Sequence, residues 1–355
     1  MKIEDLKKFT AYPTIKVVDA MEKIEKNLKG ILFIINDKGE LIGTVTDGDI
    51  RRHIVKTGNL QAEISVVMNK KPRALYSTSV GNYHEFLVKN HIRIAPVLTP
   101  DNVVCDMVTI DDSVEIRKKH SMSLKDVPLV IMAGGKGTRL YPYTRVLPKP
   151  LIPIGDVPIM ERIIDRFREY GIEELWVTLN YKRGMIKSYF AELDPPYQLN
   201  YVVEDKPLGT AGSLHLIKEK FDKPIIVTNC DVLIDADYED LYRYHLESGN
   251  ELTMVTALKN VVVPYGVVHS KENGIITSME EKPKLSYFVN TGMYILNAEL
   301  LSEIPEDTFY HMTDLTEHLL QNNRQVGMYP ISGDCFLDMG EFEEMHRMEE
   351  KLGYK

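Results

Sequence analysis

The chain has 355 residues with a formal net charge of −9 at pH 7, and its composition is 44% hydrophobic and 27% charged. This length favours two domains over one, and the composition is typical of a globular protein. No run approaches the ~18 apolar residues of a membrane span, and the first residues lack a signal-peptide core. The acidic balance argues against a general nucleic-acid partner. Three scattered cysteines, Cys105, Cys230 and Cys335, predict a cytoplasmic location and neither a disulfide framework nor a zinc cluster.

The first third of the chain repeats itself after a shift of 63 residues, without a gap. In the first copy, apolar spacing predicts a helix over 19–28 and strands over 31–35 and 41–45. A Thr-x-x-Asp motif follows the last expected strand in each copy. We therefore expect two similar units, over 1–60 and 61–120.

This repeat resembles a tandem pair of CBS domains, an α+β arrangement. In such pairs the Thr and Asp of the motif often contact the phosphate and ribose of a nucleotide, groups that a hydroxyl and a carboxylate can hydrogen-bond. Two other interpretations stay open: the pair only dimerises or packs on its neighbour, or Asp49 caps a helix that begins at Ile50. The second copy departs from the family pattern at Cys105-Asp106-Met107. The resemblance implies a possible homo-oligomer and a regulatory nucleotide at Thr46, Asp49, Thr109 and Asp112.

A charged linker is expected over 121–127, before a second domain over 128–355. That domain opens with an apolar run, Leu129–Met132, which predicts a buried strand. The glycine-rich turn after this run would let backbone N–H groups approach phosphate closely. No carboxylate occurs from Gly134 to Gly155, whereas four cationic residues do, which predicts a polyphosphate site. The turn supplies Gly134, Gly135, Gly137 and Thr138, and the four cations are Lys136, Arg139, Arg145 and Lys149.

Two other phosphate-binding motifs do not fit this turn. A P-loop needs Gly-Lys-Ser or Gly-Lys-Thr, and neither occurs in the chain. A dinucleotide fingerprint needs a third glycine, where this sequence has Leu140. Helix and strand patterns then alternate, which predicts an α/β fold with a doubly wound, Rossmann-like mixed sheet and ligands at the carboxyl ends of its strands. We expect helices over 158–170, 184–193, 210–219 and 238–247, and strands over 175–179, 198–203 and 224–228.

The string AGGKGTRLYPYTRVLPKPLIPIGDVPIM resembles the signature of the sugar-1-phosphate nucleotidyltransferases, A-G-G-x-G-T-R-L followed by P-K-P-L. The resemblance extends from Leu129 to about Arg347. It implies that an oxygen of a sugar-1-phosphate attacks the α-phosphorus of a nucleoside triphosphate and expels pyrophosphate. Such a transfer depends on positioning and charge neutralisation.

Two carboxylates match the metal-binding positions of that family. Asp231 directly follows a buried strand, and Asp338 lies in Phe-Leu-Asp-Met-Gly. The resemblance implies Mg²⁺, which takes one or two protein carboxylates together with substrate phosphates. Either residue could instead cap a helix: no helix pattern follows Asp231, but one does begin at Glu341. Cys230 stands where the family usually has glycine.

The resemblance also implies roles for cationic and sugar-binding residues. Arg139 would contact the departing phosphates, Lys149 the α-phosphate, and Lys282, in an E-K-P motif, the phosphate of the sugar. These three are the expected catalytic residues. The expected sugar contacts are Gly266, Glu281 and Asn290.

The segment E-x-x-P-L-G-T-A-G resembles the family's base-reading loop and that of mannose-1-phosphate guanylyltransferases. Gly209 would allow close approach to the base, and Glu204 would accept from the adjacent N–H donors of guanine, which favours GTP. Glu204 could also be a plain surface residue. The domain order resembles glucosamine-1-phosphate guanylyltransferases of legionaminic acid biosynthesis. The alternatives are mannose-1-phosphate as acceptor, UTP or dTTP as donor, and a nucleotide-sensing regulatory protein without activity.

Overall fold

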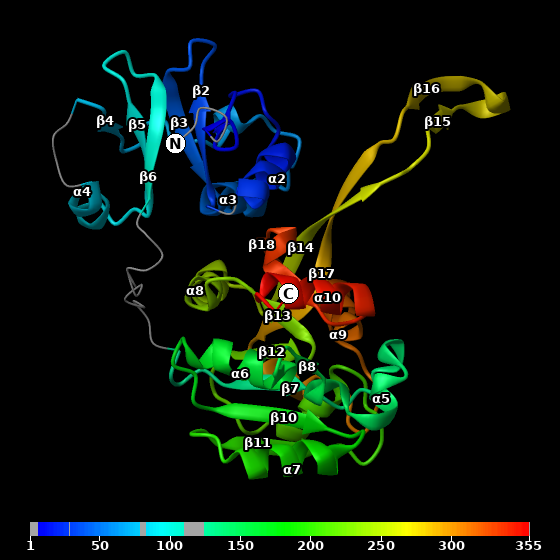
Figure 1. Cartoon of the computed structure of the whole chain (residues 1–355). Coiled ribbons are helices and arrows are strands. Elements are labelled where there is room, and N and C mark those ends of the chain that lie inside the picture. Colours follow the sequence, from blue (N-terminus) through cyan, green and yellow to red (C-terminus); the bar gives the residue numbers. More distant parts are fainter. Residues whose placement is uncertain (1–5, 28, 79–82, 110–123, 355) are drawn as a thin grey trace. The chain divides into compact units, whose positions relative to one another are not determined.

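The computed structural model describes residues 6–27, 29–78, 83–109 and 124–354, and the chain divides into two compact units (Figure 1). The first unit holds residues 1–119, 258–287 and 332–334, and the second holds the rest. Asp112 and the first part of the expected linker lie outside the described residues. Among the described residues, no helix is long and apolar enough to cross a membrane. All three cysteines are free thiols.

Two three-stranded sheets in the first unit have the same topology. In each, a short first strand pairs in parallel with the second, which pairs antiparallel with the third. The β-bulge between Ile34 and Ile35 recurs between Val97 and Leu98, which lie 63 positions later in the chain. The repeat in the sequence is therefore a repeat of structure. The strands are β1 (Thr10–Ala11), β2 (Ile31–Ile35) and β3 (Leu41–Thr46), then β4 (Leu75–Tyr76), β5 (Ile94–Leu98) and β6 (Val104–Thr109).

Helices of the first unit flank these sheets in sequence. They are α2 (Val17–Asn27), α3 (Asp47–Thr57), the 3₁₀ turn η1 (Ile64–Val66) and α4 (Tyr83–Lys89). A separate antiparallel ribbon of β15 (Val267–Ser270) and β16 (Ile276–Glu280), with η5 (Glu272–Gly274) between them, also belongs to this unit.

A seven-stranded mixed sheet forms the centre of the second unit, in the order β11-β10-β7-β12-β17-β14-β18; only residues 258–262 of β14 and 284–287 of β17 belong to the first unit. Its first four strands are parallel, β17 is antiparallel to β12, and β14 is parallel to β18 (Figure 1). The doubly wound mixed sheet predicted from the alternating pattern is confirmed. The strands are β7 (Leu129–Met132), β10 (Leu175–Leu179), β11 (Leu199–Val203), β12 (Ile225–Asn229), β14 (Leu252–Val262), β17 (Lys284–Leu296) and β18 (Val326–Ile331).

Helices cover both faces of this sheet because its central strands are apolar on both sides. In β7, Leu129 and Ile131 contribute to one apolar cluster, and Val130 and Met132 to the other. The first cluster includes side chains of α6 (Ile159–Arg168), α7 (Arg183–Leu193), α8 (Tyr238–Ser248) and α10 (Phe342–Lys351). The second includes side chains of η4 (Gly212–Ile217), η6 (Ala298–Ser302) and α9 (Met312–Gln321).

The helix expected over 210–219 is wrong: the segment forms the shorter 3₁₀ helix η4. Backbone N–H groups of Ala211 and Gly212 both donate to the carbonyl of Tyr310, at 2.9 and 3.0 Å. These hydrogen bonds tie the start of the segment to a distant loop. Small elements complete the unit: α5 (Tyr143–Val146), η2 (Thr138–Leu140), η3 (Lys149–Leu151), β8 (Pro153–Ile154), β9 (Val157–Pro158), β13 (Val232–Ile234), η7 (Gly333–Cys335, its last residue in this unit) and β19 (Phe336–Asp338).

A buried histidine joins α8 to the sheet and makes the stability of this unit depend on pH. The His245 ring donates from Nε2 to Asn297 Oδ1 at 3.1 Å, and its Nδ1, which lies 2.8 Å from Thr253 Oγ1, is then the acceptor of the neutral ring. Burial lowers the pKa of His245 below its ordinary value of 6.5, and the hydrogen bond with Asn297 opposes this only in part. The folded chain therefore keeps the ring neutral where the unfolded chain protonates it.

We expect the free energy of unfolding to fall as the pH drops below about 6.5, because protons bind preferentially to the unfolded state. In a His245→Gln variant, this loss between pH 7.5 and 5.5 should be smaller. Urea unfolding of both chains at the two pH values measures the difference. An equal loss in both chains would mean that other groups cause the pH dependence.

Candidate active site

A cavity of about 300 Å³ lies in the second unit, beside the carboxyl end of β12. Its walls come from segments far apart in the chain: the turn after β7, the end of β12, the middle of β17, the start of α9 and the end of β19. Several polar side chains line it, namely Arg139, Thr210, Asn229, Asp231, Asn290, His311 and Asp338. The position matches the edge of a doubly wound sheet where ligands bind.

Pairing between β13 and β19 brings the two expected metal carboxylates together. These antiparallel strands place Val232 opposite Asp338, and Met339 N–H donates to the carbonyl of Asp231 at 2.8 Å. Neither aspartate caps a helix. A strand follows Asp231, and the N-cap of α10 is Glu341.

Two cations accompany these carboxylates. Lys149 Nζ forms an ion pair with Asp231 Oδ2, and both residues are only 8% exposed. A Cβ added at Gly340 would lie 3.0 Å from an Asp338 oxygen and 3.2 Å from Arg139 Nη1, so glycine leaves room for both side chains. Burial and the charge of Asp231 raise the pKa of the Asp338 carboxyl, while Lys149 and Arg139 lower it. The four groups thus share one electrostatic environment.

The glycine-rich turn packs against Lys149 of this cluster. Gly137 has a φ of +63°, and a Cβ there would lie 2.9 Å from Thr144 and 3.1 Å from the Cβ of Lys149. Glycine is therefore needed both for the backbone conformation and for the packing of Lys149. Gly135 faces open space, and Thr138 is exposed at the start of η2.

Glu204 is buried, at 3% exposure, so the interpretation of it as a surface residue is wrong. Its Oε2 accepts from the N–H of Leu208 at 3.2 Å, and a Cβ at Gly134 would lie 2.5 Å from its Oε1. The carboxylate therefore packs against the glycine-rich turn and fixes the start of the 204–212 loop. Further along this loop, Gly209 has a φ of +79° and approaches the backbone of Tyr310.

Burial raises the pKa of the Glu204 carboxyl above its ordinary 4.5, and hydrogen bonds to it oppose this only partly. Ionising Glu204 thus costs more in the folded chain, and stability falls as pH rises from about 4.5 through the folded pKa. We expect Glu204→Gln to be more stable than the natural chain at pH 8, and this advantage to shrink towards pH 5. Calorimetric melting across that range measures it. The exposed Glu219→Gln is the control, and a Glu204→Gln effect independent of pH would contradict the argument.

Thr210 and His311 line the cavity, although the sequence analysis did not select them. Thr210 Oγ1 accepts from the Met312 N–H at 3.0 Å and lies 3.3 Å from His311 Nδ1. The hydroxyl hydrogen is then free to donate to Nδ1, which leaves Nε2 of a neutral ring as the donor. Thr210 belongs to the P-L-G-T-A-G string, but His311 is about a hundred residues away and has no motif.

Asn229 and Asn290 face the same cavity from β12 and β17. A Cβ at Gly292 would lie 2.2 Å from Asn229 Nδ2, so a side chain at Gly292 would displace that amide. The amide of Asn290 donates to Tyr294 Oη at 2.6 Å and accepts from the Gly292 N–H at 2.9 Å. The Asn290 amide is thus held in a fixed orientation.

Three expected site residues, Gly266, Glu281 and Lys282, belong to the first compact unit. A Cβ at Gly266 would lie 3.0 Å from Glu281 Oε2, and Lys282 has a φ of +47°. None of these three is among the residues that line the cavity of the second unit.

The Thr-x-x-Asp motif of the first repeat forms a capping box at α3. Thr46 is the N-cap. Asp49 Oδ2 accepts from the Thr46 N–H at 2.9 Å and from the Thr46 hydroxyl at 2.7 Å. Asp49 therefore takes part in capping a helix, as the structural interpretation expected, but that helix begins at Asp47 and not at Ile50, and its N-cap is Thr46. Thr109 is exposed at the end of β6.

Sequence comparison agrees with these features. The Nucleotidyl transferase family model matches residues 129–354, and the CBS domain model matches residues 3–56. The chain belongs to the nucleotidyl transferase family. It also carries an N-terminal CBS domain.

Two curated relatives illustrate the range of this family. One is "UTP--glucose-1-phosphate uridylyltransferase" from Synechocystis sp., 35% identical over 233 residues, which are 60% of this chain and 60% of the relative. The other is "Mannose-1-phosphate guanyltransferase" from Debaryomyces hansenii, 31% identical over 228 residues with the same coverage. The chain thus spans about 60% of the length of these relatives.

Solved structures show the same fold. HddC from Yersinia pseudotuberculosis has a TM-score of 0.52 at 24% identity, over 64% of this chain and 99% of HddC. A putative glucose-1-phosphate thymidylyltransferase from Bacillus anthracis has a TM-score of 0.51 at 23% identity, over 63% of this chain and 94% of that protein. Both confirm the architecture of the transferase sheet.

Proposed function

We propose that this chain is a sugar-1-phosphate nucleotidyltransferase, which joins a nucleoside monophosphate to a sugar-1-phosphate and releases pyrophosphate. The observation that carries the proposal is the pair of Asp231 and Asp338 beside a cavity, with Lys149 and Arg139 next to them. Family membership and relatives with printed sugar-phosphate nucleotidyltransferase names support it.

In the proposed reaction, an oxygen of the sugar phosphate bonds to the α-phosphorus, and the bond from that phosphorus to the bridging α–β oxygen breaks. The electron pair leaves with pyrophosphate, and the attacking phosphate is already anionic, so no proton has to be removed. Lys149 would neutralise the α-phosphate, and Arg139, exposed at the mouth of the turn, would bind the departing phosphates. N–H groups of the glycine-rich turn would orient the triphosphate.

The donor set of Asp231 and Asp338 fits Mg²⁺, since two adjacent carboxylates leave the remaining positions for phosphate oxygens and water. A bound Mg²⁺ would neutralise phosphate charge there. By family resemblance, Lys282 would bind the phosphate of the sugar, and Gly266, Glu281 and Asn290 its hydroxyls. Asn290 has the fixed amide that this role needs.

For the substrates, we propose GTP and glucosamine-1-phosphate. The guanyltransferase relative supports GTP, whereas the uridylyltransferase relative keeps UTP as the rival donor. The Glu204 carboxylate already accepts from the Leu208 N–H and packs against Gly134. It can contribute to base choice only through lone pairs that these contacts do not use. The choice of glucosamine-1-phosphate as acceptor is based on the resemblance in domain order, and mannose-1-phosphate is the rival acceptor.

A pyrophosphate-release assay over GTP, UTP, dTTP and ATP, each with glucosamine-, glucose- and mannose-1-phosphate, tests these assignments. We expect release with GTP and the highest kcat/KM with glucosamine-1-phosphate. Release with UTP and none with GTP would overturn the guanylyl assignment. No release with any pair would overturn the transferase itself and favour a nucleotide-sensing role.

For the first 120 residues, we propose two CBS repeats, over 1–60 and 61–120, that bind a regulatory nucleotide and support a homo-oligomer. We further propose that the transferase domain begins near 128 and that the enzyme is cytoplasmic. A nucleotide at Thr46 and Asp49 would have to exchange with their mutual hydrogen bonds. Thermal shift of the full chain with AMP, ATP, GMP and GTP, compared with Asp49→Ala, tests this. A shift that Asp49→Ala leaves unchanged would place the nucleotide elsewhere.

A further inference from the structure

A second cavity, of about 480 Å³, lies at the opposite edge of the parallel strands. Its lining residues immediately precede or begin these strands: Pro128 before β7, Glu173 and Glu174 before β10, Gln198 and Asn200 at the start of β11, and Phe221 to Lys223 before β12. The proposed transferase site uses the other ends of the same strands, so this cavity takes no part in that reaction.

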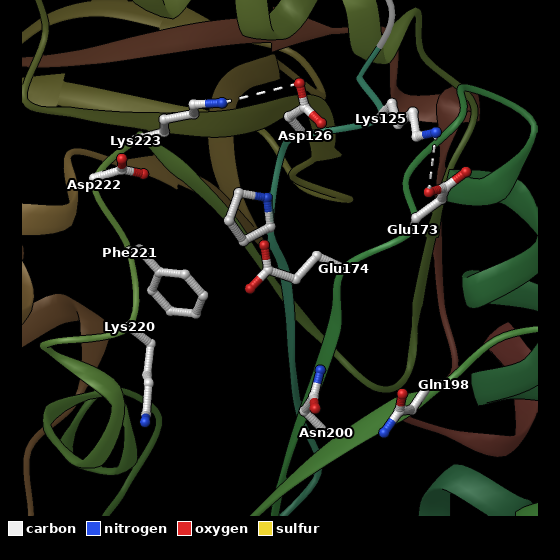
Figure 2. Close-up of a pocket in the computed structure, with 11 residues that line it drawn as sticks. Lys125, Asp126, Glu173, Glu174, Gln198, Asn200, Lys220, Phe221, Asp222 and Lys223 are labelled. Carbon is white, nitrogen blue, oxygen red and sulfur yellow. Dashed lines mark ion pairs between the residues drawn. The ribbon is translucent and has the colours of Figure 1, made fainter.

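Trp176 organises the cavity by fixing two of its lining groups. Its Nε1 donates to Glu174 Oε1 at 2.9 Å, and its ring meets that of Phe221 edge to face, with centroids 5.5 Å apart. Figure 2 shows the Phe221 ring and the Glu174 carboxylate on either side of one open space, with Asn200 at its lower end. An aromatic face and a carboxylate are thus held in position before any ligand binds.

Two polar side chains that are held in place in this space, Glu174 and Asn200, present hydrogen-bond acceptors. Glu174 has lone pairs left beyond the Trp176 bond, and Asn200 uses its amide nitrogen on the carbonyl of Leu175 at 3.2 Å, so its Oδ1 remains to accept. A complementary ligand must therefore be rich in O–H or N–H donors and must have an apolar face for Phe221.

The charge of the lining disfavours phosphorylated ligands. Three lysines and four carboxylates line the cavity, and two of these lysines are paired with carboxylates: Lys125 with Glu173 at 3.5 Å and Lys223 with Asp126 at 4.0 Å. The surplus is one negative charge, which disfavours phosphate and nucleotides and favours a neutral or cationic ligand. A pyranose ring with hydroxyl or amino groups has this combination of donors, apolar face and charge.

We propose that this second cavity is a binding site for an unphosphorylated hexose or hexosamine, with the sugar ring against Phe221 and its donors on Glu174 and Asn200. The volume is within the range of small-ligand pockets. The site is separate from the transferase cavity, so a test of this proposal does not depend on whether the proposed reaction occurs.

Saturation-transfer NMR on the full chain with D-glucosamine and D-glucose, and with glucose 1-phosphate as the anionic comparison, tests the proposal. We expect glucosamine and glucose to bind and the phosphate to bind more weakly at this site. Glu174→Gln should weaken glucosamine binding about tenfold, since it removes the charged acceptor but keeps the shape. Phe221→Leu should weaken both free sugars by a similar factor.

Two controls separate this site from the transferase cavity. Asn290→Ala, in the other cavity, should leave glucosamine affinity at this site unchanged. Pyrophosphate release by Glu174→Gln should equal that of the natural chain. If no free sugar binds, or if Asn290→Ala abolishes binding while Glu174→Gln does not, the proposal is wrong.

Discussion

Asp231→Asn should reduce pyrophosphate release by about two to three orders of magnitude, with the fold retained. The substitution removes the charge that pairs with Lys149 and halves the carboxylate pair available to a divalent ion. Asn is close in shape to Asp, and the backbone bond from Met339 to the carbonyl of residue 231 does not depend on the side chain. Steady-state kinetics at saturating substrates, with circular dichroism for the fold, measure the effect.

The matched control is Asp235→Asn, four residues further along the same segment. Asp235 pairs with Arg166, and its side chain is 74% exposed, so its loss should change turnover less than about twofold. Asp338→Asn should match Asp231→Asn in kcat. Near-normal turnover in Asp231→Asn would remove this residue from the reaction and with it the proposed metal pair.

The central sheet could be predicted because its signals are local. Apolar runs such as 129–132 and 175–179 mark buried strands, and alternation with helix patterns leaves few topologies. The pairing of Asp231 with Asp338 came from family motifs, since nothing in the intervening hundred residues indicates that β13 and β19 are neighbours.

Other features depend on contacts that no local pattern encodes. Glu204 is buried with its carboxylate against Gly134 and Leu208, and the N–H groups at the start of η4 donate to the carbonyl of Tyr310, about a hundred positions away. The Thr46 motif shows a different difficulty. Its spacing suits a nucleotide, but it is also the spacing of a capping box, and the structure uses it as one.

Lys149→Met should lower the free energy of unfolding by about 3 kcal/mol, because it leaves Asp231 buried and unpaired beside Asp338. The double variant Lys149→Met/Asp231→Asn should recover more than half of this loss, since no isolated charge then remains at either position. Urea unfolding of the natural chain, both single variants and the double variant gives the coupling between the two residues.

Activity should not follow stability in this series. The double variant should fold nearly as well as the natural chain, yet release pyrophosphate no faster than Asp231→Asn alone, because both charges act on the phosphates. Lys206→Met, which breaks the exposed pair with Asp307, should cost less than about 1 kcal/mol and leave turnover intact. If the two single losses of stability simply add in the double variant, the Lys149–Asp231 pair contributes nothing to the fold. If the double variant turns over normally, the buried pair is structural and the reaction occurs elsewhere.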